Sequence, residues 1–390
     1  MVWIMFALLA SLTLLYFLIS ISLLIGVSRL KKNAQKSDAV PYVSILVPAR
    51  DEEKLIAACL ESLVHQQYPP DKYEIVIVND RSRDNTSAIV REYQDRYSII
   101  KCINLDHNSS GLTGKQNAMN EGLKHCNGEI ILNTDADCIV KPLWIRRTVS
   151  CFSPKVGLTI GLSTAYNVDG TSSLFTDLQS LDTLFLMDAA AGSIGMNVHV
   201  GCAGSNLAYR KAILDGKGYL GIGYTITEDT ALIQSVARNT DWSITAVYDR
   251  DAAIETASEK SLKRFLAQRL RWLLGGQAGK DLSLIPLYFV FLFHSCIAVF
   301  IPLMFFISSL IPFVLLSILI KIILDFIRCW RVCKEFDRRD LLYVFMPYEA
   351  FIIFYSVIIG LGSIFVRKVR WKEDKYTARK EVRKRMKNEG

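Results

Sequence analysis

The chain has few of the residues that hold transition metals and lacks the glycine patterns that bind dinucleotides. Only 5 of its 390 residues are histidine, and its 9 cysteines include no C-x-x-C pair. Zinc sites need such residues at short spacing, so a zinc-binding domain is excluded. No G-x-G-x-x-G pattern occurs, and the glycines of 111–115 are too close together for a Walker A loop. A dinucleotide cofactor and a P-loop nucleotidase are therefore unsupported.

Charge is missing from two long stretches. Residues 1–28 and residues 282–320 contain no Asp, Glu, Lys or Arg. Because ~20 apolar residues cross a bilayer, we expect a transmembrane helix over 1–28 and two spans in the second stretch. Lys31, Lys32 and Lys36 follow the first stretch, so the positive-inside rule places the next domain in the cytoplasm.

A third apolar stretch, 341–366, follows basic residues from Lys321 to Arg339 that we interpret as a return to the cytoplasmic side. A basic tail, 367–390, comes after it, with 11 Lys or Arg and 4 Asp or Glu, a net charge of 11 − 4 = +7. If the third stretch crosses once, the tail lies outside; if it is re-entrant or split around Pro347, the tail stays inside. We expect a cytoplasmic tail, which is either a solvated charge run or a contact for anionic lipid headgroups. No nucleic-acid partner is expected, because the basic surplus lies in this tail.

The middle of the chain alternates between strand-like and helix-like segments. Short β-branched or aromatic runs predict four strands, at 42–47, 73–78, 99–105 and 129–132. Each is followed by a polar turn and a helical pattern, which predicts an α/β fold, a Rossmann-like, mostly parallel sheet with helices on both faces. Ligands bind such sheets at the carboxyl ends of the strands, and Asp80, Asp135 and Asp137 fall there.

Asp135 and Asp137 form an Asp-x-Asp pair after a predicted strand. Two carboxylates at this spacing suit a hard divalent ion, Mg²⁺ or Mn²⁺, that binds the phosphates of a nucleotide-sugar. Alternatively, the two residues only begin a turn. Asp80, at the equivalent place two strands earlier, and the acidic run 48–53 favour a ligand site.

Several motifs occur in an order that resembles the membrane-bound family 2 glycosyltransferases. They are Pro-Ala-Arg-Asp-Glu-Glu at 48–53, Asn-Asp-Arg-Ser-Arg-Asp-Asn-Thr at 79–86, Gly114-Lys115, Asp135-Ala-Asp137, Thr227-Glu-Asp229 and Gln268-x-x-Arg271-Trp272. The resemblance covers about 40–274 and implies a GT-A fold. It implies a nucleotide-sugar site, with a UDP-sugar as donor, at Pro48, Ala49, Arg50, Glu52, Asp80, Lys115 and Asp135. It also implies a metal ion on Asp137 and Asp135. Arg81 departs from the pattern, because many relatives carry glycine there.

Asp229 stands in the first turn of a predicted helix. An acid there also suits the helix dipole without any catalytic purpose. In the family this acid is the general base, which takes the proton of the acceptor hydroxyl as its oxygen attacks C1. One base and one displacement imply inversion, an α-linked donor giving a β-glycoside. The segment 201–210 resembles the family's loop on the acceptor side.

Gln268, Arg271 and Trp272 share one face of a predicted helix, because their spacing is i, i+3 and i+4. The segment 258–280 therefore reads as an amphipathic interfacial helix, and a membrane anchor is the alternative role. The apolar residues expected on the opposite face are Leu262, Leu266 and Leu273. Resemblance implies that Arg271 contacts the diphosphate, that Trp272 stacks on the acceptor, and that Gln268 orients the pair. Trp371-Lys372 resembles a C-terminal motif of membrane relatives.

These patterns predict a multi-pass protein of the bacterial inner membrane. Its expected parts are an N-terminal transmembrane helix (1–28), a catalytic domain (40–257), an interfacial helix (258–280), a C-terminal transmembrane region (281–366) and a cytoplasmic tail (367–390). We expect an inverting, metal-dependent transferase that moves a sugar to a membrane lipid at the cytoplasmic face. Three or four apolar segments are few for a polymer channel. A processive polysaccharide synthase of the chitin, hyaluronan or cellulose type is the main alternative, and a catalytically inactive sugar-nucleotide sensor is another. The sugar, the lipid and the oligomeric state remain open.

Overall fold

The computed structural model describes residues 2–33, 37–108, 112, 114–201, 204–214, 216–223, 225, 227–277, 285–366, 368–371 and 374–377. Lys36, Lys372 and most of the basic tail lie outside the described residues. The helices are α1 (Val2–Asn33), α2 (Ile56–Val64), α3 (Thr86–Arg96), α4 (Gly114–Leu123), α5 (Trp144–Val149), α6 (Leu174–Gly195), α7 (Glu228–Asn239), α8 (Leu262–Gln277), α9 (Ile285–Leu303), α10 (Ile311–Glu335) and α11 (Phe345–Phe365). The strands are β1 (Val43–Ala49), β2 (Tyr73–Asp80), β3 (Ile100–Leu105), β4 (Ile130–Asn133), β5 (Cys138–Ile139), β6 (Val156–Gly161), β7 (Ser163–Tyr166), β8 (Leu207–Arg210), β9 (Ser243–Val247), β10 (Ile254–Ala257), β11 (Lys368–Trp371) and β12 (Asp374–Thr377).

A seven-stranded mixed sheet forms the centre of the catalytic domain, in the order β3-β2-β1-β4-β8-β6-β9. The first four of these strands are parallel, and β8 runs antiparallel to both of its neighbours. The chain leaves β1 toward β2 and β3, then returns to β4 on the other side of β1. This reversal creates a crevice beyond the carboxyl ends of β1 and β4, which is where such sheets bind ligands.

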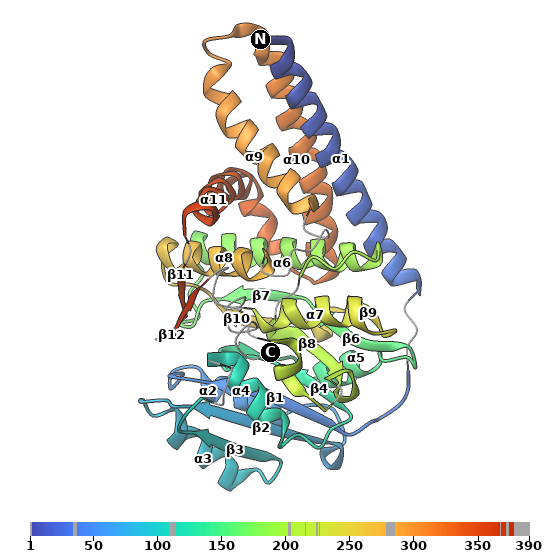
Figure 1. Ribbon diagram of the computed structural model, residues 1–390, viewed down its shortest axis with the longest axis vertical. Coiled ribbons are helices and arrows are strands. Elements are labelled where there is room, and N and C mark those ends of the chain that lie inside the picture. The colour runs from blue at the N-terminus through green and yellow to red at the C-terminus, as the bar shows by residue number, and fades with distance from the viewer. Residues whose placement is uncertain are drawn as a thin grey trace, which may run out of the picture.

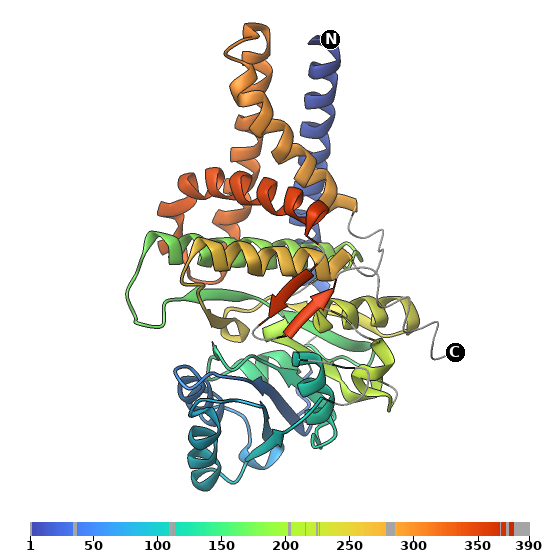
Figure 2. The ribbon, with the colours of Figure 1, turned by 60° about the vertical axis from the view of Figure 1, so that its left-hand side comes forward.

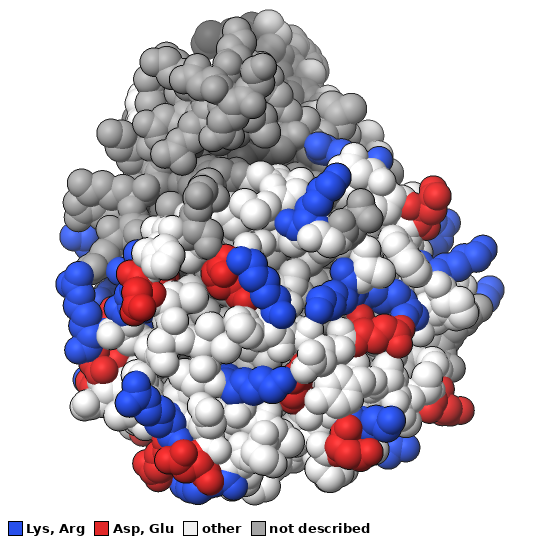
Figure 3. All heavy atoms as spheres, turned by 60° about the horizontal axis from the view of Figure 1, so that its bottom comes forward, with Lys and Arg blue, Asp and Glu red and all other residues white. Residues whose placement is uncertain are grey.

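The four strands predicted from the sequence are confirmed as β1 to β4, within two residues at each end. All eight residues of β2 are buried, because helices cover both faces of the sheet. This explains why β2 carries apolar residues on both of its faces, from Ile75 to Val78. On the side of the domain turned away from the apolar helices, basic and acidic side chains are interspersed (Figure 3).

A second layer separates this sheet from the long apolar helices. Helices α6 and α8 lie across the molecule above the sheet, and the small sheet β5-β10-β7 lies between them and the main sheet (Figures 1 and 2). Helix α1 crosses α6 at glycines: a Cβ added at Gly26 would stand 1.9 Å from the carbonyl oxygen of Gly192. The close approach of the two backbones fixes α1 on this layer.

Four helices of the described chain are long and apolar enough to cross a membrane: α1, α9, the segment Ser308–Glu335 that contains α10, and the segment Arg339–Phe365 that contains α11. Three of them, α1, α9 and α10, form an upright bundle. Helix α11 instead lies across the base of that bundle, end-on in Figure 1 and lengthwise in Figure 2. It is one continuous helix with Pro347 in its first turn, so the hairpin split around Pro347 does not form.

Helix α10 continues past the point where the sequence suggested an exit from the membrane. Lys321 is only 1% exposed and donates to Asp325 (2.8 Å) and Glu349 (2.6 Å). Asp325 also accepts from Tyr16 of α1, at 2.6 Å. A buried charge needs paired, hydrogen-bonded partners, and here these come from α1, α10 and α11. The ion pairs and the Tyr16 hydrogen bond thus connect α10 to α11 and to α1.

Candidate active site

The carboxyl ends of β1 and β2 bring Pro48, Ala49, Arg50 and Asp80 to one edge of the sheet. Asp80 ends β2, and its side chain is 3% exposed. Its carboxylate lies 3.7 Å from Nη1 of Arg50 and accepts from Nε of Arg81 at 2.7 Å. Two guanidinium groups thus fix Asp80 at the edge where the nucleotide is expected. Arg81, with φ at +57°, adopts the left-handed conformation that the glycine of relatives favours.

The loops after β1 and β2 are tied to each other. The amide of Asp51 donates to Ser82 at 3.0 Å, and the Asp51 carboxylate accepts from the amide of Arg83 at 2.8 Å. The amide of Glu52 donates to Thr86 at 2.8 Å. These hydrogen bonds join the two loops at the edge where the nucleotide is expected.

Lys115, in the first turn of α4, joins two parts of the site that are far apart in sequence. Its Nζ lies 2.7 Å from Oδ1 of Asp135 and 3.1 Å from Oε1 of Glu228. Burial alone would lower the pKa of Lys115, but Asp135, Glu228 and Asp229 raise it well above its ordinary value. The lysine is therefore a fixed cation between the Asp-x-Asp pair and the start of α7.

Asp135 and Asp137 follow β4 directly, as the sequence predicts. Burial, then the negative charges of Asp135 and Glu52, raise the pKa of Asp137 to about 7. Carboxylate oxygens are what Mg²⁺ and Mn²⁺ prefer, and a divalent cation would relieve this repulsion, so the residues fit such an ion. Among the described residues no group of three or more His, Cys, Asp or Glu could hold a metal. The ion's remaining ligands would then be phosphate oxygens and water.

Asp229 stands in the first turn of α7, as predicted. Its Oδ1 accepts from the amide of Thr230 at 2.6 Å, and a Cβ added at Gly204 would lie 2.6 Å from its Oδ2. Burial, then the charge of Glu228, raise the pKa of Asp229 to about 6, although Lys115 and Arg271 act against them. A carboxylate that ionises near pH 6 suits proton abstraction at neutral pH.

Helix α8 carries Gln268, Arg271 and Trp272 and packs against the start of α7. A Cβ added at Gly275 would stand 2.3 Å from Oγ1 of Thr227. Arg271 is close enough to Asp229 to lower its pKa. Gln268 donates to Glu259 at 3.2 Å, and its role in orienting Arg271 and Trp272 stays a prediction.

Helix α8 buries Phe265 and Arg269 against the rest of the protein, and the expectation that its leucine face meets the membrane surface stays a prediction. Leu262 is 41% exposed, while the buried side chains include Phe265 and Arg269. Leu266 and Leu273 are only partly buried. Arg269 was not among the residues expected at the site; arginine is rarely buried unless it is paired. The signal that could have found it is the i+4 spacing from Phe265 to Arg269, which repeats the apolar period of the helix.

Arg269 forms a buried network that joins α8 to α6 and α11. Its Nη2 lies 2.6 Å from Oδ2 of Asp182, and the other Asp182 oxygen accepts from Tyr348 and Tyr355. Its guanidinium carbon lies 4.2 Å from the ring centroid of Trp272, a cation–π distance. The orientation of Trp272 therefore depends on a salt bridge that also holds α11.

Replacing Asp182 with asparagine is expected to destabilise the protein by about 3–5 kcal/mol, because it leaves the buried Arg269 charge without its partner. The melting temperature in detergent measures this effect. Asp177→Asn, on the same helix but in a more exposed contact with Tyr343, is the matched control and should change stability by less than about 0.5 kcal/mol. Equal shifts in the two variants would contradict the role given to the network.

The sheet topology, the acidic edge and the overlying apolar helices define a glycosyltransferase of the GT-A fold. The chain belongs to glycosyltransferase family 2. The family model described as "Glycosyl transferase family group 2" matches residues 130–360, more than half of the chain, and "Glycosyl transferase family 2" matches residues 44–215.

Three curated relatives are each 27–31% identical to this chain over about 245 residues. The probable glycosyltransferase YdaM of Bacillus subtilis is 31% identical over 245 residues, which is 61% of this chain and 56% of that protein. The beta-monoglucosyldiacylglycerol synthase of Nostoc sp. is 30% identical over 246 residues, 61% of this chain and 49% of that protein. The poly-beta-1,6-N-acetyl-D-glucosamine synthase of Staphylococcus epidermidis is 27% identical over 241 residues, 61% and 55% of the two chains. The chain thus spans about half the length of the curated relatives it matches.

One solved structure shares the fold over almost the whole chain. It is the mannosyltransferase PcManGT of Pyrobaculum calidifontis in complex with GDP-Man and Mn²⁺, with a TM-score of 0.61. The alignment covers 93% of this chain and 99% of that one, at 17% sequence identity. At this identity the match establishes the fold alone.

Proposed function

We infer that the protein transfers one sugar from a UDP-sugar to a membrane lipid, with inversion at C1. The observation that carries this inference is the double ion pair of Lys115, which lies 2.7 Å from Asp135 and 3.1 Å from Glu228. Lys115 thus links Asp135, on the side of the sheet where the donor is expected, to Glu228, the residue before Asp229. The site lies beneath α6 and α8, on the side of the domain that faces the apolar helices.

The donor would lie across the carboxyl ends of β1, β2 and β4. Pro48 and Ala49 end β1, so their backbone would border the nucleoside, and Asp80 would accept from the uracil or ribose. Arg50 holds Asp80 in place, and Glu52 adds a negative charge near Asp137. Lys115 would lie beside the diphosphate, where its positive charge attracts phosphate oxygens.

A divalent ion, Mg²⁺ or Mn²⁺, would be held by Asp137 and Asp135. Such an ion offsets the negative charge on a departing diphosphate. Arg271 of α8 would contact the same diphosphate; its proximity to Asp229, whose pKa it lowers, supports a place in the site.

Asp229 would act as the general base. Its carboxylate takes the proton of the acceptor hydroxyl while the hydroxyl oxygen bonds to C1 of the sugar. The bond between C1 and the diphosphate oxygen breaks, and the electron pair leaves with UDP. Attack opposite the leaving group converts an α-linked donor into a β-glycoside. Trp272 would give the acceptor a stacking surface, held by Arg269.

A lipid acceptor is favoured over a growing polymer by the arrangement of the membrane helices. Only α1, α9 and α10 stand upright among the described helices, which is few for a polymer channel in one chain. The similarity to a glucosyldiacylglycerol synthase supports a lipid acceptor. The similarity to a polysaccharide synthase supports the processive alternative, in which several chains would line the channel.

The donor assignment is tested by competition. If the donor is UDP-linked, purified protein should bind UDP more tightly than GDP. Displacement of a fluorescent UDP-sugar analogue by each nucleoside diphosphate measures the preference. Stronger displacement by GDP would contradict a UDP-linked donor.

We also propose that α1, α9 and α10 span the membrane while α11 lies along its cytoplasmic surface. Three crossings place the catalytic domain and the tail on the same side. A fluorescent reporter that folds only in the cytoplasm, fused after Gly390, is therefore expected to be bright. The same reporter fused ahead of Val2 should be dark. A dark C-terminal fusion present at the same protein level would mean that α11 crosses the membrane.

A further inference from the structure

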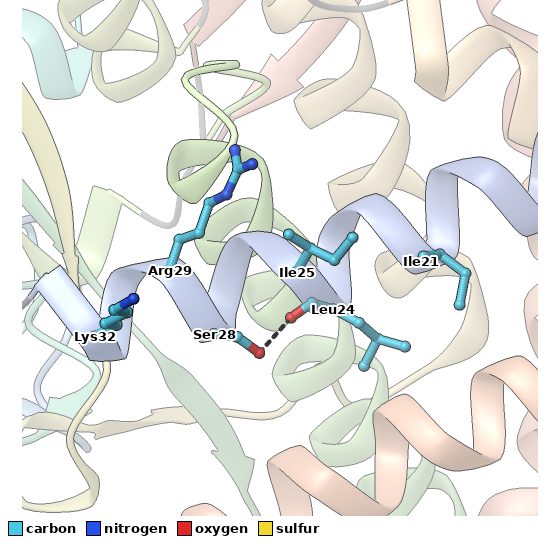
Figure 4. Close-up of a pocket in the computed structure, with 6 residues that line it drawn as sticks. All are labelled: Ile21, Leu24, Ile25, Ser28, Arg29 and Lys32. Atoms are coloured by element: carbon cyan, nitrogen blue, oxygen red, sulfur yellow. Dashed lines mark hydrogen bonds between the residues drawn. The ribbon is translucent and has the colours of Figure 1, made fainter.

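An open, shallow groove of about 410 Å³ lies on one face of α1 alone, near the end of the helix that meets the catalytic domain. It is lined by Ile21, Leu24, Ile25, Ser28, Arg29 and Lys32 (Figure 4). Their spacing of three and four residues places them along one side of the helix. At 1.5 Å per residue, residues 21–32 extend for about 16 Å along the helix.

The groove changes from apolar to basic along its length. Ile21, Leu24 and Ile25 line one end, and Ile25 is 44% exposed. Arg29 and Lys32 lie at the other end, toward the catalytic domain. Because α1 is a membrane-grade helix, its apolar end belongs in the hydrocarbon region and its basic end at the headgroups.

The two cations of the groove have no acidic partner in the part of the chain that the structure describes. Arg29 donates only to the thioether of Met196, at 3.5 Å. Lys31, between them in sequence, differs: its Nζ pairs with Glu335 of α10 at 2.8 Å. The positive charge of Arg29 and Lys32 is thus uncompensated by the described acidic residues, and it lies beside the exposed side chain of Ile25.

We propose that this groove binds one anionic glycerophospholipid of the surrounding bilayer. The lipid phosphate lies between Arg29 and Lys32, and an acyl chain packs along Ile21, Leu24 and Ile25. The inference rests on the groove and its charges and does not depend on the sugar, the acceptor or the metal. It goes beyond the transferase reaction, because the bound lipid is a resident component rather than the acceptor.

The position of the site gives the lipid a route to influence activity. Met196, which Arg29 contacts, is the C-cap of α6. The chain then runs from α6 to Gly204, which lies against the carboxylate of Asp229. A lipid bound to Arg29 would therefore lie close to Met196. The segment that reaches Gly204, beside the proposed base Asp229, begins after this residue.

The test measures lipid binding to the full chain in detergent by native mass spectrometry. Dioleoyl phosphatidylglycerol is the probe, and dioleoyl phosphatidylcholine, with the same acyl chains, is the neutral control. Phosphatidylglycerol is expected to bind at one site, more tightly than phosphatidylcholine. The double variant Arg29→Gln/Lys32→Gln should weaken it about 30-fold, as expected for two basic residues at the membrane surface. Lys31→Gln, which removes the same kind of charge from an adjacent position, should leave binding within about twofold.

Two further measurements distinguish lipid binding in the groove from a general attraction between the basic residues and any anion. Ile25→Trp fills the apolar end without changing charge and is expected to abolish the single bound lipid. Glycerol phosphate, which has the anionic headgroup without the chains, should not displace it. Equal loss of binding in Lys31→Gln, unchanged binding in Ile25→Trp, or displacement by glycerol phosphate would each overturn the proposal.

Discussion

Replacing Asp229 with asparagine is expected to lower kcat about 10²- to 10⁴-fold while nucleotide binding stays nearly unchanged. Asparagine keeps the shape of the side chain at Gly204 but cannot accept a proton from the acceptor. The donor edge, which includes Asp80, Lys115 and Asp135, is left intact. Transfer rate and UDP affinity, measured on the same preparation, report the two effects separately.

Two controls make this result specific. Asp71→Asn changes an exposed acid far from the site and should alter neither quantity. The pH profile of the unmodified enzyme is the second control: burial and Glu228 raise the pKa of Asp229 to about 6, so kcat/KM should fall as pH drops below about 6 and the base becomes protonated. If Asp229→Asn loses UDP binding as fully as transfer, the residue has a structural role.

Chelation of divalent metal is expected to stop turnover, and Mn²⁺ or Mg²⁺ should restore it. Burial, then the negative charges of Asp135 and Glu52, raise the pKa of Asp137 to about 7, and a divalent cation would relieve the repulsion among these carboxylates. In Asp137→Asn, Mn²⁺ should no longer strengthen UDP binding, a loss of at least about tenfold in the metal-dependent affinity. Calorimetry of UDP binding with and without Mn²⁺ measures the difference.

The matched control for this variant is Asp249→Asn, an acid on the same domain that pairs with Arg147 at 3.6 Å and lies outside the acidic edge. It should keep the full metal effect. Turnover that continues unchanged in excess chelator would rule out a metal-dependent mechanism.

The parts of the fold that depend on local pattern could be predicted from the sequence. Strands β1 to β4 were predicted because each contains a short β-branched or aromatic run followed by a polar turn. The acidic edge followed from them, since Asp80 and Asp135 come at or just after strand ends. The pairing of Lys115 with Glu228 could not be predicted, because 113 residues separate them (228 − 115) and only the folded sheet brings them together.

Buried charges were the main features that sequence patterns did not reveal. Lys321 was interpreted as the start of a cytoplasmic segment, but it lies inside α10 with Asp325 and Glu349 as partners. Arg269 was passed over between Gln268 and Arg271, although it is the most buried of the three. Arg269 pairs with Asp182 of α6 and Lys321 pairs with Glu349 of α11, and these contacts depend on helix packing. Asp325, the second partner of Lys321, lies one turn along the same helix, so its proximity follows from the i, i+4 spacing.

Product analysis tests the central claim, a single transfer to a membrane lipid, most directly. Purified protein is incubated with membrane lipid extract, Mn²⁺ and each common UDP-sugar in radiolabelled form, and the products are separated by thin-layer chromatography and gel filtration. We predict that the label appears in one discrete lipid spot, with one sugar per lipid. Label in a long, lipid-free chain would contradict this account and establish a processive synthase.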